Sequence, residues 1–160
     1  MKCKSLQALK NELNKKITNA LKEEVNNIVI DAMIEHINED VYNVYEPKFY
    51  QRRYTNDGLA DISNIDSDVK HCVLAVQNNA IANPVIYIAG KELKSQNQGN
   101  FLTPIIETGN GYDFSSTTSG GREYLKPRPF VSNTNEDLKN NKQHITALKK
   151  GLKRQGVRCE

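Results

Sequence analysis

Aromatic and sulfur-containing residues are scarce in this sequence of 160 residues. Tryptophan is absent, and the chain has only 4 Phe, 2 Met and 3 Cys. Apolar residues make up 38% of the chain, which is low for a compact globule. The length suits one domain, but a thin core makes its stability marginal. We therefore expect a partner interface to supply burial, or else a middle segment that is disordered when alone.

The three cysteines do not have the spacing of a redox or metal-binding motif. Cys3 and Cys159 lie near the two ends, Cys72 lies in the middle, and their number is odd. Disulfide scaffolds and zinc knuckles are recognised by paired, closely spaced cysteines. The cysteine pattern therefore predicts a reducing compartment.

Long apolar runs are also missing. The first residues, MKCKSLQALKNEL, lack the apolar stretch of a signal peptide. Nowhere does the chain approach the roughly 18 consecutive apolar residues of a membrane span. We expect a soluble protein that is made in a cytoplasm and has no membrane partner.

The residue types of catalytic and ligand-binding sites do not come together in this sequence. His36, His71 and His144 lie in different predicted elements, and residues 109–111 lack the lysine of a phosphate-binding loop. The aspartates of residues 57–68 lack the central glycine and terminal glutamate of a calcium loop. We therefore expect no enzymatic activity, no bound metal and no cofactor.

One apolar stripe at helical spacing runs through the first forty residues. Its members recur every third or fourth position: Leu6, Leu9, Leu13, Ile17, Leu21, Val25, Ile28 and Ala32. No Gly or Pro interrupts residues 1–46, so the N-terminal segment 1–40 predicts a helix over about residues 5–39. At on the order of 50 Å, this helix should project or pack on a neighbour at one end. The alternative is two shorter helices with a break near Asn26.

Residues 41–130 have the features of a β-rich body. Residues 91–100 are polar and predict a loop, and residues 109–121 are rich in Gly, Ser and Thr. We expect this second segment to be a mobile loop that a neighbouring subunit orders. Three other segments predict strands: residues 68–78, 85–89 and 102–108.

Residues 131–156 predict one C-terminal helix. Thr134 and Asp137 have the spacing of a capping box, and Gly156 is a natural stop. Residues 1–160 then form a single α+β domain. It consists of a long N-terminal helix, a small antiparallel β-sheet with a long mobile loop, and a C-terminal helix packed on the sheet.

Positive charge is concentrated at the C-terminal end. Residues 122–160 carry 10 Lys and Arg against 4 Asp and Glu, whereas the whole chain has a net charge of only +3. This basic end can face nucleic acid, contact the acidic body of another subunit, or simply be a solvated helix surface.

Tyrosine and arginine gather in residues 42–54. These residue types are enriched at the energetic centres of protein interfaces, and arginine beside tyrosine can also stack on nucleic acid bases. Tyrosines at this density can instead form the edge of a small core. The composition alone leaves these three interpretations open.

Several short motifs follow one another along the chain. They are Val41-Tyr42 to Val44-Tyr45, Tyr50-Gln51-Arg52-Arg53, Gly58-Leu59, Ile106-Glu107-Thr108-Gly109 followed by Tyr112, and Arg128-Pro129-Phe130. In this order they resemble the small tail-completion and head–tail joining proteins of tailed bacteriophages. In that family a long N-terminal helix precedes the first motifs, and the last motif leads into the final helix.

The resemblance implies a non-enzymatic virion protein that assembles in the host cytoplasm as a subunit of an axial ring. Its partners would be copies of itself and neighbouring neck, connector and tail proteins, with at most weak contact with genomic DNA. The motif residues that we expect at subunit interfaces are Tyr45, Tyr50, Arg52, Arg53, Gly58, Leu59, Arg128, Pro129 and Phe130.

Two features depart from that family: the polar, Asn-rich residues 77–100 and the long first helix. They leave open whether the chain forms the joining ring or another small subunit of the neck or near the tail fibres. The alternative function is a DNA-binding accessory protein. Its nucleic-acid-facing residues would be Lys149, Lys150, Lys153 and Arg154 on the last helix.

Overall fold

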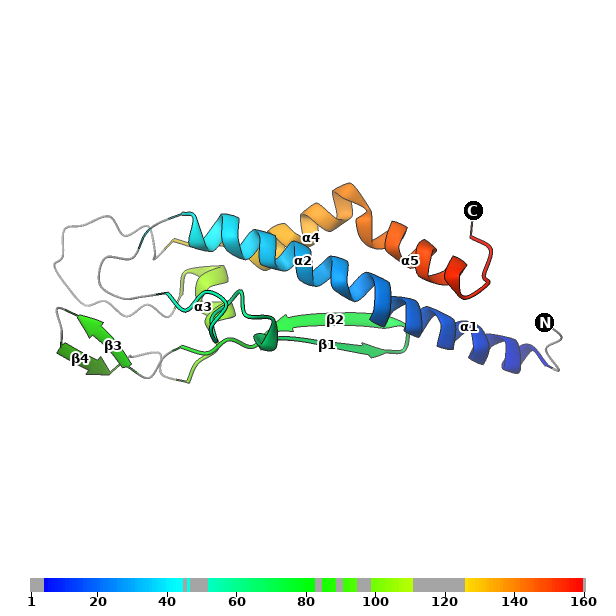
Figure 1. The fold of residues 1–160 in the computed structure, drawn as a ribbon, viewed down its shortest axis with the longest axis horizontal. Coiled ribbons are helices and arrows are strands. Elements are labelled where there is room, and N and C mark those ends of the chain that lie inside the picture. Colours follow the sequence, from blue (N-terminus) through cyan, green and yellow to red (C-terminus); the bar gives the residue numbers. More distant parts are fainter. Residues whose placement is uncertain are drawn as a thin grey trace. The chain divides into compact units, whose positions relative to one another are not determined.

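Figure 1 shows the fold of the chain, a computed structural model. The structure describes residues 5–44, 46, 52–82, 85–88, 91–94, 99–110 and 126–159. Helices and strands both occur, so the predicted α+β class is confirmed. Among the described residues, no helix combines the length and the apolar character that crossing a membrane requires.

The chain divides into two compact units. The first unit holds Met1–Ala32, Ser67–Gln77 and Glu136–Glu160, and the second holds Met33–Asp66 and Asn78–Asn135. Each unit takes its residues from separate stretches of the sequence. Each therefore depends on contacts between residues that lie far apart along the chain.

The predicted N-terminal helix is confirmed as one uninterrupted helical run (Figure 1). It consists of two α-helical and two π-helical segments: α1 (Leu6–Ala20), η1 (Leu21–Val25), α2 (Asn26–His36) and η2 (Ile37–Tyr42). Ser5 caps its start, because the Ser5 Oγ accepts a hydrogen bond from the backbone N–H of Ala8 at 3.1 Å. The alternative of a break near Asn26 is wrong, since a π-helical turn leads directly into α2.

The apolar stripe of this helical run is buried only in part. Ile17, Leu21, Val25 and Ile28 pack in the core of the first unit, and Ala32 is buried as well. Its first three members are exposed: Leu6 at 83%, Leu9 at 50% and Leu13 at 42%. These three leucines on successive turns of α1 form a surface that we call the leucine ridge.

The core of the first unit joins the helical run to the C-terminal helix and to two strands. Its buried centre consists of Leu21, Val25 and Ala147, the last from α5 (Gln143–Arg154). Val69 of β1 (Ile65–Lys70) and Leu74 of β2 (Val73–Asn78) pack against this centre. The C-terminal helix α5 therefore shares a core with the helical run and with the β1–β2 sheet, and its predicted direct packing on the sheet stays a prediction.

The strands β1 and β2 form a hairpin where the sequence predicted a single strand over residues 68–78. That prediction is wrong because His71 and Cys72 form a turn between the strands, with φ of 51° and 62°. Positive φ at both central residues is characteristic of the two-residue turns that join antiparallel strands.

A second two-stranded sheet consists of β3 (Val85–Ile88) and β4 (Lys91–Lys94). The strands are antiparallel, with Val85 opposite Lys94 and Ile88 opposite Lys91. The strand predicted at residues 85–89 is confirmed, whereas the loop predicted over residues 91–100 is wrong at β4. Strand pairing uses backbone groups, so the polar sequence KELK can pair with an apolar strand.

The strand predicted at residues 102–108 is wrong, because α3 (Leu102–Thr108) is a helix. Pro104 lies in its first turn, where the missing N–H of proline has no intrahelical acceptor to lose. Gly109 ends the helix with a φ of 69°. A glycine in this left-handed conformation is a common end of a helix.

The single C-terminal helix predicted over residues 131–156 is in fact two helices, α4 (Phe130–Asn141) and α5. Lys142 interrupts them with a φ of 57°. Thr134 does not cap a helix as predicted, because α4 begins four residues earlier. The Thr134 side chain is buried inside α4, and its Oγ1 donates to the carbonyl of Phe130 at 2.6 Å.

Candidate functional site

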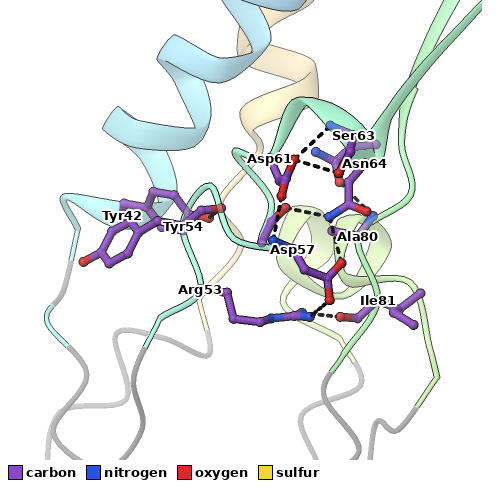
Figure 2. A network of polar contacts seen from close by, with 11 residues as sticks. Tyr42, Arg53, Tyr54, Asp57, Asp61, Ser63, Asn64, Ala80 and Ile81 are labelled. Carbon is purple, nitrogen blue, oxygen red and sulfur yellow. Dashed lines mark hydrogen bonds and ion pairs between the residues drawn. The ribbon is translucent and has the colours of Figure 1, made fainter.

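The four predicted contact residues of the 52–59 segment lie in a loop of the second unit that leads into η3 (Ile62–Asn64). They are Arg52, Arg53, Gly58 and Leu59. Figure 2 shows the polar network that Arg53 and Asp57 of this loop form with nearby residues. The network holds the loop to other residues of its own unit.

Arg52 packs against Tyr42 at the end of the helical run. One Nη of Arg52 donates a short hydrogen bond to the carbonyl of Tyr42, and the guanidinium carbon lies 5.4 Å from the centre of the Tyr42 ring. The rings of Tyr42 and Tyr54 meet edge to face at 4.8 Å. The Tyr42 hydroxyl also accepts from the N–H of Ala60 at 3.3 Å. Burial raises the pKa of Tyr42 above its ordinary value, and the backbone of Ala60 and Leu59 and the two nearby arginines partly offset this rise.

Arg53 bridges two segments of the same unit (Figure 2). It forms an ion pair with Asp57 at 2.6 Å and donates a second hydrogen bond to the carbonyl of Ile81. The Asp57 N–H donates to the Asp61 carboxylate at 2.6 Å, and Ser63 donates to it from both its hydroxyl and its N–H. These hydrogen bonds, the Ser63 hydroxyl first, lower the pKa of Asp61.

Gly58 and Leu59 have structural roles in this loop. A Cβ on Gly58 would lie 2.8 Å from the backbone N of Tyr54, so only glycine fits this close approach. Leu59 is buried, and its carbonyl accepts a hydrogen bond from the side chain of Asn78 at 2.6 Å. Both residues are therefore engaged within the unit, and their predicted place in a subunit contact stays a prediction.

Arg128, Pro129 and Phe130 form the entry into α4. The Arg128 N–H donates to the carbonyl of Ile106 at 2.9 Å, and Phe130 is fully buried. The first backbone N–H groups of α4 have no acceptor within the helix, and the Glu107 carboxylate accepts hydrogen bonds from two of them. Its two oxygens accept from the N–H groups of Val131 and Ser132, each at 3.0 Å. These contacts show how the motif seats the helix on α3, and they leave its role between subunits untested.

Two of the predicted contact residues, Tyr45 and Tyr50, lie outside the described residues. The same holds for most of the predicted mobile loop, of which the structure describes only residues 109 and 110. The predictions made for these residues therefore stay predictions.

The predicted nucleic-acid-facing residues lie together near the end of α5. Lys149, Lys150 and Lys153 are exposed. Arg154 instead donates from its Nε to Glu24 at 2.8 Å and from an Nη to Glu23. These two carboxylates raise the pKa of Arg154 and neutralise its charge locally. The structure brings the four residues together, but the Arg154 side chain forms ion pairs that link α5 to η1.

Groups that could hold a metal ion do not assemble within the described parts of the chain, where no three His, Cys, Asp or Glu side chains come together. Cys72 and Cys159 are free thiols. The predicted lack of cofactors and of enzymatic activity stays a prediction.

Sequence reasoning missed two residues on which the packing depends, Glu107 and Gly151. Gly151 lies inside α5, where a Cβ would lie 2.7 Å from the Cβ of Ala20 on α1. A glycine inside a helical pattern is itself a signal for such close packing. Glu107 left no local signal, because the helix that it caps begins more than twenty residues later.

The described residues define a small α+β protein whose notable features are internally braced loops and an exposed leucine ridge. The sequence model of the YomN family matches residues 5–154. The chain therefore belongs to the YomN family.

A curated relative supports the same relationship. The chain is 30% identical over 123 residues to the SPbeta prophage-derived uncharacterized protein YomN of Bacillus subtilis (strain 168), covering 76% of this chain and 71% of that protein. No solved structure matches the chain. The prophage origin of the relative associates this chain with bacteriophages. The tail-completion role that the motifs implied is more specific than this association with bacteriophages, and it is therefore treated below as a proposal.

Proposed function

We propose that this chain is a non-enzymatic structural protein of a tailed bacteriophage virion. It acts in the neck, at the head–tail connection or in tail completion, as a subunit of an axial ring. Its partners are further copies and the adjoining neck, connector and tail proteins, and it enters the virion from the host cytoplasm. The prophage-derived relative supports the bacteriophage setting. The leucine ridge is the observation that carries the proposal of assembly.

The leucine ridge differs from ordinary exposed apolar residues by its order. Single exposed leucines are normal on a protein surface, but a contiguous apolar stripe marks a contact. The ridge continues the same stripe whose later members, beginning at Ile17, are buried in the core or packed against it. Covering one leucine side chain contributes about 1.5–3 kcal/mol. A ridge that contacts a different patch on the next copy generates a ring when the rotation closes.

Replacement of Leu9 and Leu13 by Ser is expected to abolish assembly while the isolated chain stays folded. About half of each side chain is already buried in the isolated chain, so the double change should lower the free energy of unfolding by about 2 kcal/mol. Light scattering after gel filtration measures assembly, and chemical denaturation measures stability. Ile17→Ser is the matched control on the same stripe, and it should lower stability because Ile17 packs into the core.

Phage particles test the proposed place of the chain. A phage that lacks this gene should accumulate separate heads and tails in electron micrographs, and the wild-type gene supplied in trans should restore joined particles. The Leu9→Ser, Leu13→Ser variant should fail to restore them. Normal particles without the protein, or full rescue by the variant, would contradict the proposal.

A DNA-binding accessory function is the second candidate, and the exposed lysines of α5 favour it. We expect the triple change Lys149→Ala, Lys150→Ala and Lys153→Ala to leave assembly intact, with weak DNA binding in parent and variant. If the lysines contact phosphates, the slope of log affinity against log salt should instead fall by about 0.9 for each contact removed. Submicromolar binding at physiological salt that the triple change abolishes would overturn the structural proposal.

A further inference from the structure

The sheet of β1 and β2 has two outer edges, and no other described strand pairs with either of them. An edge strand presents a row of backbone N–H and C=O groups that pair with water or with another extended chain. Residues 67–77 of this hairpin lie within the first unit. The hairpin can therefore accept a further strand at either edge, and its side chains decide which edge does so.

The two strands differ in the charges that keep an edge from pairing. β1 carries Asp66, Asp68 and Lys70, and charged side chains on an edge strand oppose the addition of a further strand. β2 has the sequence VLAVQN, without charge, proline or glycine. An uncharged and largely apolar edge of this kind is prone to aggregate unless a partner covers it. The pattern therefore favours β1 as the edge that stays in solvent and β2 as the edge that is covered.

Hydrogen bonding sets the register of the hairpin. A two-residue turn joins the strands, so Asp68 lies opposite Ala75 and the two residues exchange backbone hydrogen bonds. The N–H of Asn79 donates to the carbonyl of Asn64 at 2.7 Å, and this bond belongs to the same register just beyond the strands. In an antiparallel pair every second residue points its backbone groups away from its partner strand. The residues on either side of Ala75 therefore direct theirs to the outer edge of β2.

These outward backbone groups belong to Leu74 and Val76, and they suit the same strand of a second copy. When two such strands lie antiparallel, Leu74 of one faces Val76 of the other, and each pair exchanges two hydrogen bonds. Ala75 then faces its own counterpart across a two-fold axis, at the close spacing of a non-hydrogen-bonded pair. Ala75 is small and exposed, so two alanines fit there, and Val73 faces Gln77 on the same exposed side. Like charges do not meet, because β2 has none.

We infer that two copies of this chain pair through the outer edges of β2, which joins the two hairpins into one antiparallel sheet. A second copy is the occupant because β2 complements itself in backbone hydrogen bonds, in apolar side chains and in its lack of charge. The contact uses the same surface on both copies, so it closes at a pair and leaves the charged β1 strands as the outer edges. This inference does not rest on the proposed ring, because it uses a strand and not the leucine ridge, and it applies to the isolated chain.

Charge placed at Ala75 tests the pairing with the full chain. Ala75→Lys and Ala75→Glu each bring like charges face to face at the two-fold axis, so each variant alone should have the mass of a monomer where the wild type has that of a dimer. An equimolar mixture of the two variants should recover the dimer, because opposite charges then face each other. Light scattering after gel filtration measures the mass, and circular dichroism measures folding. The control Asp68→Lys changes an exposed residue of β1 and should pair as the wild type does.

Disulfide trapping tests the register of the paired strands. In a chain whose three cysteines are replaced by Ser, Ala75→Cys should form a disulfide between two copies on mild oxidation. The reason is that the Cα atoms of a non-hydrogen-bonded pair lie about 4.5 Å apart, within the range of a disulfide. Asp68→Cys in the same background is the control. It is exposed on the same face but lies on β1, away from the axis, and should stay monomeric on a non-reducing gel.

The outcomes separate this inference from the proposed function. A wild-type dimer that both charge variants retain, or equal cross-linking at the two cysteine positions, overturns the inference. A wild-type chain that is monomeric at every concentration also overturns it, while separate heads and tails after deletion of the gene would still support the proposed function. If Ala75→Cys cross-links to a different protein in virions and not to a second copy, the edge has another partner and the inference fails. A cross-linked pair from a gene whose deletion leaves joining intact overturns the proposed function alone.

Discussion

Replacement of Phe130 by Ala is expected to lower the free energy of unfolding by about 3–5 kcal/mol. The Phe130 side chain is fully buried in the second unit, so the variant loses this burial and leaves a cavity at the start of α4. Chemical denaturation of the isolated chain, followed by circular dichroism, measures the change.

Val131→Ala is the control for this experiment. Val131 is the next residue of α4 and is only half-buried, so its truncation should cost about 1 kcal/mol. If Phe130→Ala also costs no more than this and yet abolishes assembly, Phe130 belongs to a subunit contact, as the sequence predicted. The large loss of stability would instead assign it to the core.

Replacement of Gly151 by Ala is expected to destabilise the chain by about 2 kcal/mol. Ordinarily alanine in place of glycine inside a helix stabilises by roughly 0.5–1 kcal/mol, so the expected change has the opposite sign. The reason is the close packing of α5 on α1. The new methyl group would lie 2.7 Å from the Cβ of Ala20, which is fixed to the helix backbone, and would press on the Glu24 carboxylate that Arg154 holds.

Lys150→Ala is the matched change on the same helix, and thermal denaturation of both variants provides the comparison. Lys150 is exposed, so its truncation should change stability by no more than about 0.5 kcal/mol. A Gly151→Ala variant that is more stable than the parent would show that the two helices do not approach so closely.

The long N-terminal helix could be predicted because its signal is local. Apolar residues three and four positions apart lie on one face of a helix, and Ser5 has the residue type that caps a helix start. The π-helical turns at η1 and η2 were not predictable in this way. They insert one extra residue into a turn without a change in residue type that sequence reasoning recognises.

The errors in the predicted elements have two different origins. Pro104 and Gly109 are ordinary helix signals that the apolar pattern of α3 outweighed in the prediction. His71, Cys72 and Lys142 have positive φ without the glycine or asparagine that usually marks it. These residue types rarely adopt positive φ, so no local residue preference could have indicated the hairpin or the break before α5.

The candidate contact residues illustrate the same limit. Arginine next to tyrosine is typical of interfaces, and on this ground the sequence predicted Arg52 and Arg53 at a subunit contact. Their partners in the described structure are the Tyr42 carbonyl, Asp57 and the Ile81 carbonyl of the same unit. Sequence composition does not indicate whether an arginine meets its own chain or another.

By itself the sequence determined the α+β class, a long N-terminal helix over about residues 5–39 and the basic C-terminal end. These features follow from periodicity, from capping and from charge counts, which depend on residues a few positions apart or on composition. Only the tertiary structure decided that Ile17 packs against the core while the leucines before it stay exposed, and that Arg154 pairs with Glu23 and Glu24. The physical reason is that burial and ion pairing depend on which distant segments pack together, and one apolar stripe is the same pattern whether a core, a neighbouring copy or water covers it.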